Sequence, residues 1–366
     1  MYRINCEGRR EVRHRTFRRL CCSSRNQLAG RSCVAAKWFH DGVTPGICAC
    51  MNVLLIGEDA AGARTMHLLK QSGARIVAVM SSPTRRGGGV TNLWDIAAKL
   101  GYTTWPAELV REARFAAQVR EAGVDLILNV HSLFVIREEI LEAPRLGSFN
   151  LHPGLLPRYA GLNSVCWAIY RGETEHGVTL HKIAPEIDTG PIVYQEVIAI
   201  DGEETGLSLT SKCTNVGIRL ISRLLEAAAN RPSHIPLTPQ DLSKREYFGR
   251  EVPENGNLFW NRPAQRIADF VRAADFFPFR SPWGPPLTKR GDATLGIAKV
   301  RMTGRPADAP PGAVGTKNDQ GVEVACADQW ILVRQLFKEG KYIRAHELLM
   351  EGDRLSDCAT SRAAKV

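Results

Sequence analysis

The stretch Met51-Asn-Val-Leu-Leu-Ile-Gly57 is a short apolar run that ends in a glycine. A helical pattern follows over residues 60–71 and stops at Gly73, and a second apolar run covers residues 75–80. Apolar runs of this length that alternate with amphipathic helical patterns are typical of strand–helix–strand units. From Met51 onward the sequence therefore predicts an α/β fold.

The same alternation continues toward the C-terminus. Helical patterns are expected near residues 93–100, through residues 107–122 and near residues 137–141. Residues 124–130 form a near-continuous apolar run, which is typical of a strand covered on both faces, and residues 147–151 form another strand. We predict a doubly wound parallel sheet of the Rossmann-like kind.

Beyond this sheet the pattern predicts a helix over residues 164–170, strands over 177–183 and 193–199, and a long helix over 206–229. The Pro-rich residues 231–239 then indicate a linker, and short strands such as 321–325 and 330–336 follow it. The predicted organisation comprises five parts: a probably disordered extension (1–50), a catalytic domain (51–230), a linker (231–254), a smaller β-rich domain (255–350) and a tail (351–366).

Charge and cysteine are concentrated in the first fifty residues. This segment holds ten Lys or Arg against three acidic residues, which accounts for +7 of the net charge of +10. It has no apolar run, so it is not a secretory signal, but its arginine-rich, acid-poor composition leaves an organelle transit peptide open as an alternative. The near-balanced charge of residues 51–366 does not demand a polyanionic partner.

The remaining features indicate a soluble, cytoplasmic protein. No stretch approaches the ~20 apolar residues that a membrane helix needs. Cys166, Cys213, Cys326 and Cys358 show no close spacing, so free thiols in a reducing compartment are expected. No set of metal ligands stands out, since Cys48-x-Cys50 lacks the paired spacing of a zinc site.

Two glycines after the first strand, Gly57 and Gly62, invite comparison with dinucleotide-binding loops. The middle glycine of GxGxxG is missing, and no acidic residue is placed to bind a ribose. A tight turn before a helix explains the same two glycines without a ligand.

The segment that carries chemistry is Gly147-Ser-Phe-Asn-Leu-His-Pro-Gly-Leu-Leu-Pro-Arg-Tyr-Ala-Gly161. Asn150 and His152 lie two residues apart at the end of a strand, so both side chains should point to one face. The carboxyl edge of a parallel sheet is where such folds bind ligands. Asp188 follows in the turn Glu186-Ile-Asp-Thr-Gly-Pro191. Taken alone, these residues would also fit turn capping and a structural histidine.

The chain resembles the formyltransferases that use 10-formyltetrahydrofolate. The resemblance runs from about Met51 to about Leu349 and is carried by three motifs. These are Asn150-Leu-His-Pro-Gly-Leu-Leu-Pro157, Gly172-Glu-Thr-Glu-His-Gly-Val-Thr-Leu-His181 and Asp188-Thr-Gly190. The resemblance implies that Asn150, His152 and Asp188 are the catalytic residues of an N-formyltransferase.

The resemblance also implies a place for the formyl donor. In the family, backbone groups near residues 130–136 and 183–188 bind the pterin. Leu133, Phe134, Ile136 and Ile183 would then line the folate site, although core packing explains these apolar residues equally well. Arg137 would face the glutamate tail of the folate or simply the solvent.

Several features bear on the acceptor. Ala160 stands where transfer-RNA formyltransferases often have arginine, and basic and acidic residues after the linker are nearly balanced. We therefore expect a small amine of the amino-sugar or hydroxyornithine type, with methionyl-tRNA as the alternative and nucleic acid otherwise not expected. A formyltetrahydrofolate hydrolase and a silent folate-binding protein remain open as alternative functions, and the oligomeric state is not visible in the sequence.

The sequence also contains an aromatic group that would form the floor of an acceptor pocket or the core of the second domain: Phe270, Phe276, Phe277, Phe279 and Trp283.

Overall fold

The computed structural model describes residues 51–83 and 92–358 of the 366-residue chain. The predictions for residues 1–50 and for the last eight residues of the tail lie outside the described residues, as do residues 84–91.

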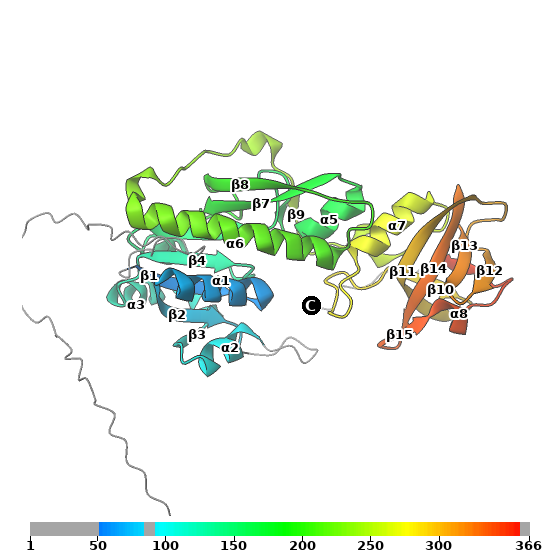
Figure 1. The fold of residues 1–366 in the computed structure, drawn as a ribbon, viewed down its shortest axis with the longest axis horizontal. Helices are drawn as coiled ribbons and strands as arrows, with labels where there is room; N and C mark the ends of the chain where they lie inside the picture. The colour runs from blue at the N-terminus through cyan, green and yellow to red at the C-terminus, as the bar shows by residue number, and fades with distance from the viewer. Residues whose placement is uncertain (1–50, 84–91, 359–366) are drawn as a thin grey trace, which may run out of the picture. The chain divides into compact units, whose positions relative to one another are not determined.

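Within the described residues, the first sheet has seven strands in the order β3-β2-β1-β4-β5-β7-β8 (Figure 1). The strands are β1 (Asn52–Gly57), β2 (Arg75–Ser81), β3 (Thr104–Pro106), β4 (Leu126–Val130), β5 (Gly147–His152), β7 (Glu175–Lys182) and β8 (Ile192–Ala199). The strands from β3 to β5 are parallel, which confirms the predicted doubly wound parallel sheet. β7 and β8 extend the sheet beyond β5 as antiparallel strands, an addition that the strand–helix rhythm did not indicate.

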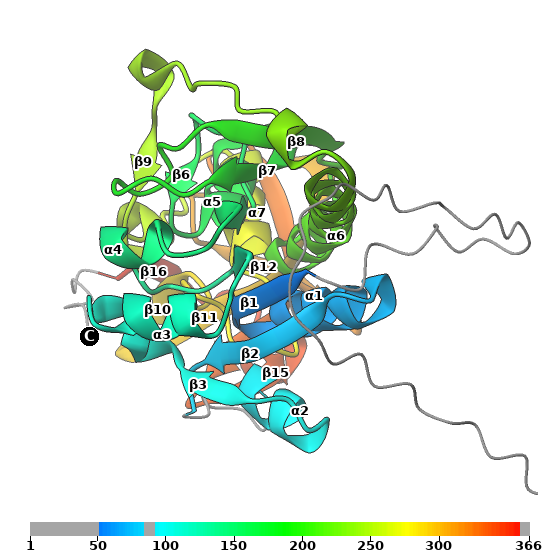
Figure 2. The same ribbon diagram turned by 90° about the vertical axis from the view of Figure 1, so that its left-hand side faces the viewer.

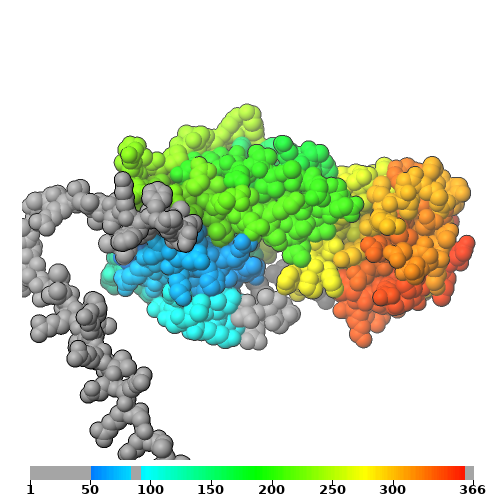
Figure 3. All heavy atoms as spheres, viewed as in Figure 1, coloured from blue at the N-terminus to red at the C-terminus, as the bar shows by residue number. Residues whose placement is uncertain are grey.

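Helices cover both faces of this sheet (Figure 2). α1 and α6 pack against one face, and η1, α3 and α4 pack against the other. The helices and 3₁₀ turns of this part are α1 (Asp59–Ser72), α2 (Leu93–Lys99), η1 (Ala107–Arg111), α3 (Phe115–Glu121), α4 (Glu138–Leu141), α5 (Ser164–Arg171) and α6 (Gly206–Asn230). The outer side of α6 forms part of the green surface in Figure 3.

The side-chain alternation of the central strands explains their continuous apolar sequence. In β1, Val53 and Leu55 join the core beneath α1 and α6, whereas Leu54 and Ile56 join the core beneath α3 and α4. Because successive side chains of a strand point to opposite faces, a strand buried on both sides needs an apolar residue at every position.

The single helix predicted over residues 107–122 is wrong. The chain forms η1, turns through an extended Glu112 and restarts as α3 at Phe115. Val110 and Phe115 both belong to the core under α3 and α4. Residues five apart on one α-helix would point about 140° away from each other, so the interruption allows both side chains to reach the same core.

The glycines after β1 are explained by packing. A Cβ atom on Gly62 would lie 2.6 Å from Leu93 Cδ2, and the Gly62 N–H donates to Glu58 O. The buried carboxylate of Glu58 accepts hydrogen bonds from Ser81 Oγ and from Ser82 N and Oγ. The structure therefore favours the tight-turn interpretation of this segment.

A second sheet forms most of the C-terminal part, which confirms the predicted β-rich character, and its strands are antiparallel. Within the described residues its strand order is β12-β13-β14-β11-β10-β16, and β15 pairs with β14. The elements are α7 (Ala264–Ala273), β10 (Leu287–Arg290), β11 (Ala293–Pro306), β12 (Val314–Asn318), β13 (Gly321–Ala325), β14 (Gln329–Lys338), β15 (Lys341–Arg344), α8 (Ala345–Leu348) and β16 (Leu355–Asp357). Helix α7 packs on α5 and on β11.

Residues 231–254 follow α6 and contain short elements of their own. These are η2 (Pro232–His234), η3 (Leu242–Lys244) and β9 (Tyr247–Phe248), and η4 (Pro253–Gly256) begins at their end. β9 pairs in parallel with β6 (Ala160–Gly161), which lies in the loop after β5. In the part of the chain that the structure describes, no helix has the length and hydropathy needed to cross a membrane.

Candidate active site

Two polar side chains at the end of β5 point to the same side of the sheet. Phe149 and Leu151 are buried in the core beneath α1 and α6, so the strand places Asn150 and His152 on the opposite side. Asn150 Oδ1 accepts a hydrogen bond of 2.9 Å from Asn129 Nδ2, its register neighbour on β4. The prediction that Asn150 and His152 share one face is confirmed.

Asp188 lies in the turn between β7 and β8, with a positive φ of 57° and a buried side chain. Its Oδ2 accepts the backbone N–H of Gly161 at 2.8 Å and lies 3.6 Å from His152 Nδ1. Its Oδ1 lies 3.4 Å from Asn150 Nδ2. The structure therefore brings together the three residues that the sequence singled out.

The surroundings of Asp188 keep its carboxyl group ionised. Burial acts to raise the pKa of Asp188, but positive charge on the His152 and His181 rings and the N–H of Gly161 together hold this pKa well below its usual range. An anionic group is thus fixed beside the His152 ring.

His181 is a fourth member of the group, to which the sequence pattern assigned no role. It lies on β7 directly opposite Asn150 on β5. Its Nε2 lies 3.0 Å from Asn150 Nδ2 and 3.4 Å from Asp188 Oδ1. This contact depends on the antiparallel pairing of β7 with β5, which the sequence pattern did not reveal.

The hydrogen-bond partners fix where the ring protons lie. A carbonyl oxygen can only accept, so His181 Nδ1 donates to Lys182 O at 2.9 Å, and its Nε2 then accepts from Asn150 Nδ2 when the ring is neutral. In the same way, His152 Nε2 donates to Tyr159 O at 2.6 Å. His152 Nδ1, which faces Asp188, is therefore the nitrogen that can take up a further proton.

The glycine of the Asn-x-His-Pro-Gly sequence has a steric role. A Cβ atom on Gly154 would lie 2.5 Å from His152 Nε2 and 2.7 Å from Tyr159 O. Any side chain there would intrude on the hydrogen bond that orients the His152 ring. The same loop is tied down at Thr179, whose hydroxyl donates to Gly154 O at 2.6 Å.

Residues 238–248 hold both loops of the site, and we call this segment the strap. Gln240 Nε2 donates to the carbonyls of Asp188 and Gly190, and Arg245 donates to Ile187 O at 3.0 Å. The ring of Phe248 stacks between Tyr159, at 5.5 Å between centroids, and Trp167, at 4.9 Å.

The residues expected to line the folate site have different environments. Leu133 is 57% exposed, whereas Ile136 is buried and Ile183 is partly buried in the core under α3 and α4. Phe134 is partly buried. The guanidinium carbon of Arg111 lies over its ring, 5.0 Å from the ring centroid.

The remaining residues singled out in the sequence are placed as follows. Arg137 pairs with Glu139 at 2.8 Å on the surface. Phe270 and Trp283 are buried and contact the ring of Tyr170. Of the other members of that aromatic group, Phe276 packs partly on the core, while Phe277 and Phe279 are exposed.

His131 is a further residue to which the sequence pattern assigned no role. It follows β4 directly and has a positive φ of 56°. Burial, with a smaller contribution from the positive charge of His152, lowers the pKa of His131 to about 4. A neutral imidazole is therefore available near His152 at physiological pH.

The sequence and the fold were compared with known proteins. Residues 51–225 match the model of the formyl transferase family, and residues 252–353 match that of the formyl transferase C-terminal domain. HypX from Aquifex aeolicus, solved in complex with tetrahydrofolic acid, is similar in structure with a TM-score of 0.57 and 16% identity over 82% of this chain and 47% of that one. The chain thus spans about half the length of the HypX chains it matches.

Smaller enzymes match over nearly their whole length. An N-formyltransferase from Helicobacter canadensis, solved with folinic acid and dTDP-3-aminofucose, has a TM-score of 0.57 and 18% identity, covering 77% of this chain and 98% of that one. WlaRD, a sugar 3N-formyl transferase, has a TM-score of 0.57 and 17% identity, with coverage of 77% and 96%. At these identities the likeness concerns the fold.

A Rossmann-like sheet with an amide, an imidazole and a carboxylate at its carboxyl edge, followed by an antiparallel β sheet, defines an α/β protein with a candidate active site at the edge of its parallel sheet. The matches to both family models then make the assignment specific. The chain belongs to the formyl transferase family.

Proposed function

We propose that this protein transfers a formyl group from 10-formyltetrahydrofolate to the amino group of a small molecule, using Asn150, His152 and Asp188. The observation that carries the proposal is the contact of these three side chains at the carboxyl edge of the sheet, within the segment that matches the family model. Residues 51–230 would act as the catalytic domain.

In this proposal, His152 and Asp188 act together as the base. Formyl transfer forms a bond from the attacking amine to the formyl carbon, breaks the bond from that carbon to the folate nitrogen, and moves one proton from the amine to the departing nitrogen. His152 Nδ1 can accept it because His152 Nε2 is already engaged by Tyr159 O. Asp188 Oδ2, 3.6 Å away, then stabilises the imidazolium.

Asn150 would stabilise the negative charge that develops on the formyl oxygen. One of its N–H groups is held by His181 Nε2 at 3.0 Å. The other faces Asp188 Oδ1 at 3.4 Å, longer than an ordinary hydrogen bond, and is the one left to donate to an oxyanion. Losing one such donor typically costs about 10²–10³-fold in rate.

The loop after β4 fits the requirements of a formyl donor with a flat ring. It joins Asn129, which contacts Asn150, to the partly exposed apolar residues Leu133 and Phe134. Asn129 Oδ1 is buried without a hydrogen-bond partner in the described structure, so it offers an acceptor for a ligand N–H. The donor supplies the activated formyl carbon, and this loop would bind and orient it.

A small amine is our proposed acceptor, and methionyl-tRNA is the alternative. Residue 160 is alanine, whereas tRNA-type members often carry an arginine at this position. Ala160 lies close to the site, because the N–H of the next residue, Gly161, donates to Asp188. The sugar N-formyltransferases among the structural neighbours act on small amines, as their names state.

We also place the protein in the cytoplasm, because Cys166, Cys213, Cys326 and Cys358 are buried free thiols.

The test is formyl transfer by the purified full chain. The enzyme is mixed with 10-formyltetrahydrofolate, and tetrahydrofolate formation is followed with nucleotide-linked amino sugars, a hydroxyornithine-type amine, methionyl-tRNA or no acceptor. We expect turnover that requires a small amine and falls at least about 10²-fold in His152→Ala. His67→Ala on the exposed side of α1 is the matched control and should keep wild-type activity.

Each other result contradicts part of the proposal. Turnover with methionyl-tRNA alone would assign the alternative acceptor. Formate release at an equal rate without any acceptor would identify a hydrolase. A chain that binds the folate but acts on none of these acceptors would be the silent folate-binding protein.

A further inference from the structure

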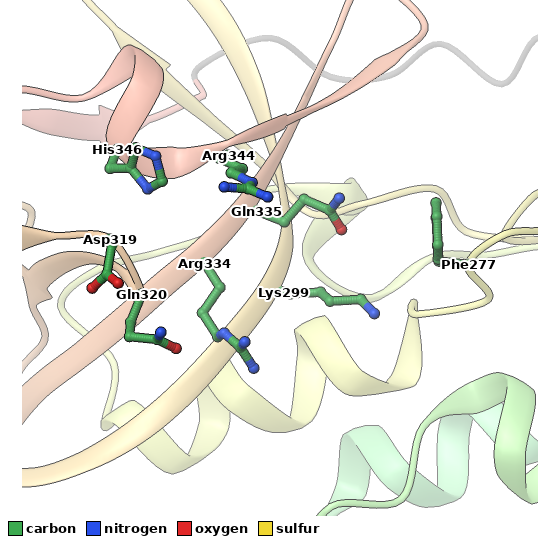
Figure 4. Close-up of a pocket in the computed structure, with 8 residues that line it drawn as sticks. All are labelled: Phe277, Lys299, Asp319, Gln320, Arg334, Gln335, Arg344 and His346. Carbon is green, nitrogen blue, oxygen red and sulfur yellow. The ribbon is translucent and has the colours of Figure 1, made fainter.

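A cavity of about 480 Å³ opens on the C-terminal sheet (Figure 4). Basic side chains from three neighbouring strands line it: Lys299 from β11, Arg334 from β14 and Arg344 from β15. Asp319, in the turn between β12 and β13, is the single carboxylate of the lining. The lining therefore carries a net excess of two positive charges, and its volume lies within the range of small-molecule sites.

The two arginines are not neutralised by the protein. Within the described residues, neither Arg334 nor Arg344 forms an ion pair, whereas Arg290 of the same sheet binds Asp353 at 2.8 Å. Lys299 has a carboxylate near it, but Asp275 Oδ2 lies 3.9 Å away, at the limit of an ion pair. The positive charge in the cavity is thus largely uncompensated.

Such an arrangement favours an anionic ligand. Like charges gathered in a concave site repel each other, and an anion bound among them relieves this repulsion. Guanidinium groups present paired N–H donors that match the oxygens of a phosphate group. The amide groups of Gln320 and Gln335 add neutral donors to the same lining.

The shape of the cavity bears on the rest of the ligand. Figure 4 shows the two arginines and Lys299 between Phe277 at one end and Asp319 with Gln320 at the other. The Phe277 ring is 43% exposed, and Lys299 Nζ lies 5.2 Å from its centroid. Phe277 therefore offers an apolar face beside the positive charge.

We propose that this cavity binds a small molecule that carries two phosphate groups close together, as in a diphosphate. The phosphate oxygens lie between Arg334, Arg344 and Lys299, and the remainder of the ligand lies toward Phe277. A nucleic-acid backbone fits less well, because it requires positive charge along an extended surface rather than within one cavity. All of the lining residues belong to the C-terminal part, so the proposal does not depend on formyl transfer.

The experiment is a calorimetric titration of the full chain with inorganic diphosphate at low ionic strength. We expect saturable binding of one diphosphate per chain. Arg334→Gln and Arg344→Gln should each weaken it by about tenfold or more, since each removes charge-assisted hydrogen bonds. Asp319→Asn should strengthen binding, because it removes the one negative charge of the lining.

Arg301→Gln is the matched control. Arg301 is an exposed arginine on β11 outside the cavity, and its loss should leave the affinity unchanged. The thermal unfolding temperature of each variant without ligand shows whether it remains folded, and added diphosphate should raise this temperature less in the two arginine variants than in the wild type.

Three outcomes would overturn the proposal. The first is an absence of saturable diphosphate binding, and the second is an affinity that is unchanged in both arginine variants. The third concerns a parallel titration in which a single-stranded RNA oligonucleotide replaces diphosphate. Tighter binding of this RNA through Arg334 and Arg344 would assign the cavity to a nucleic-acid backbone.

Discussion

Gln240 donates its side-chain amide to two carbonyl oxygens of the Asp188 turn, Asp188 O at 2.9 Å and Gly190 O at 2.6 Å. Asp188 adopts a positive φ in this turn, a backbone conformation that is unfavourable for most residues. The strap therefore holds the turn that carries the Asp188 carboxylate, although Gln240 lies 52 residues further along the chain.

Gln240→Ala should lower kcat by about tenfold or more while leaving the KM for the donor within about twofold. The reason is that a misplacement of the Asp188 turn by a fraction of an ångström weakens its contact with His152. Steady-state kinetics with both substrates measures the effect. Gln118→Ala on the exposed side of α3 is the control, and an equal loss in both variants would contradict the positioning role.

His181→Ala should lower kcat by about 10–10²-fold, because Asn150 loses the acceptor that orients its amide. His181→Gln should keep more activity, since a glutamine oxygen can still accept from Asn150 Nδ2. The kcat of the two variants is compared with that of His234→Ala, an exposed histidine bonded to its neighbour Ser233. Equal losses in the alanine and glutamine variants would show that packing, not hydrogen bonding, is what His181 supplies.

Gly161→Ala should impair both stability and turnover. An added Cβ would lie 2.2 Å from Phe248 O, and φ at this residue is +91°. The strain displaces β9 from β6 and moves the N–H that binds Asp188. We expect a loss of about 1–3 kcal/mol in the free energy of unfolding, measured by urea titration, together with reduced kcat.

Gly202→Ala is the matched control for this change, because an added Cβ at that residue would have no atom within 4 Å and its φ is not in the left-handed region. Wild-type stability in Gly161→Ala would show that the strap can move away from Gly161 at little cost and does not fix the loop after β5.

The stability of the fold should fall below neutral pH, in part because of His176. The pKa of His176 is lowered to about 4, mainly by burial. The hydrogen bond to Pro153 O acts to raise this pKa and the positive charge of His152 acts to lower it, and both effects are smaller than that of burial. Between about pH 6.5 and pH 4 the unfolded chain therefore binds a proton at this position that the folded chain does not. Stability contributed by the neutral ring is complete above pH 6.5 and is lost as the pH falls toward 4.

The expected loss between pH 7 and pH 5 is about 2 kcal/mol from this group. Urea unfolding at both pH values measures it. His176→Gln keeps a donor for Pro153 O but cannot titrate in this range, so its stability should depend less on pH by about that amount. An unchanged pH dependence would assign the acid sensitivity to other groups.

Much of the local structure could be predicted because it depends on neighbouring residues. Every strand predicted in the first sheet is present, and α6 spans almost the range expected from its apolar periodicity. The split of residues 107–122 could not be predicted, because it arises from the position of the core that Val110 and Phe115 share. The antiparallel direction of β7 and β8 was likewise hidden, since the apolar pattern of a strand carries no information about its direction.

The sequence by itself determined the α/β order, the common face of Asn150 and His152 and the family resemblance, since these follow from residue spacing and from motifs along the chain. The tertiary structure alone decided the contact of Asp188 with His152, the place of His181 opposite Asn150 and the support of Gln240 beneath the Asp188 turn. Each of these contacts joins residues about thirty or more positions apart. Strand pairing and the path of the strap set such distances, and neither is encoded in local periodicity.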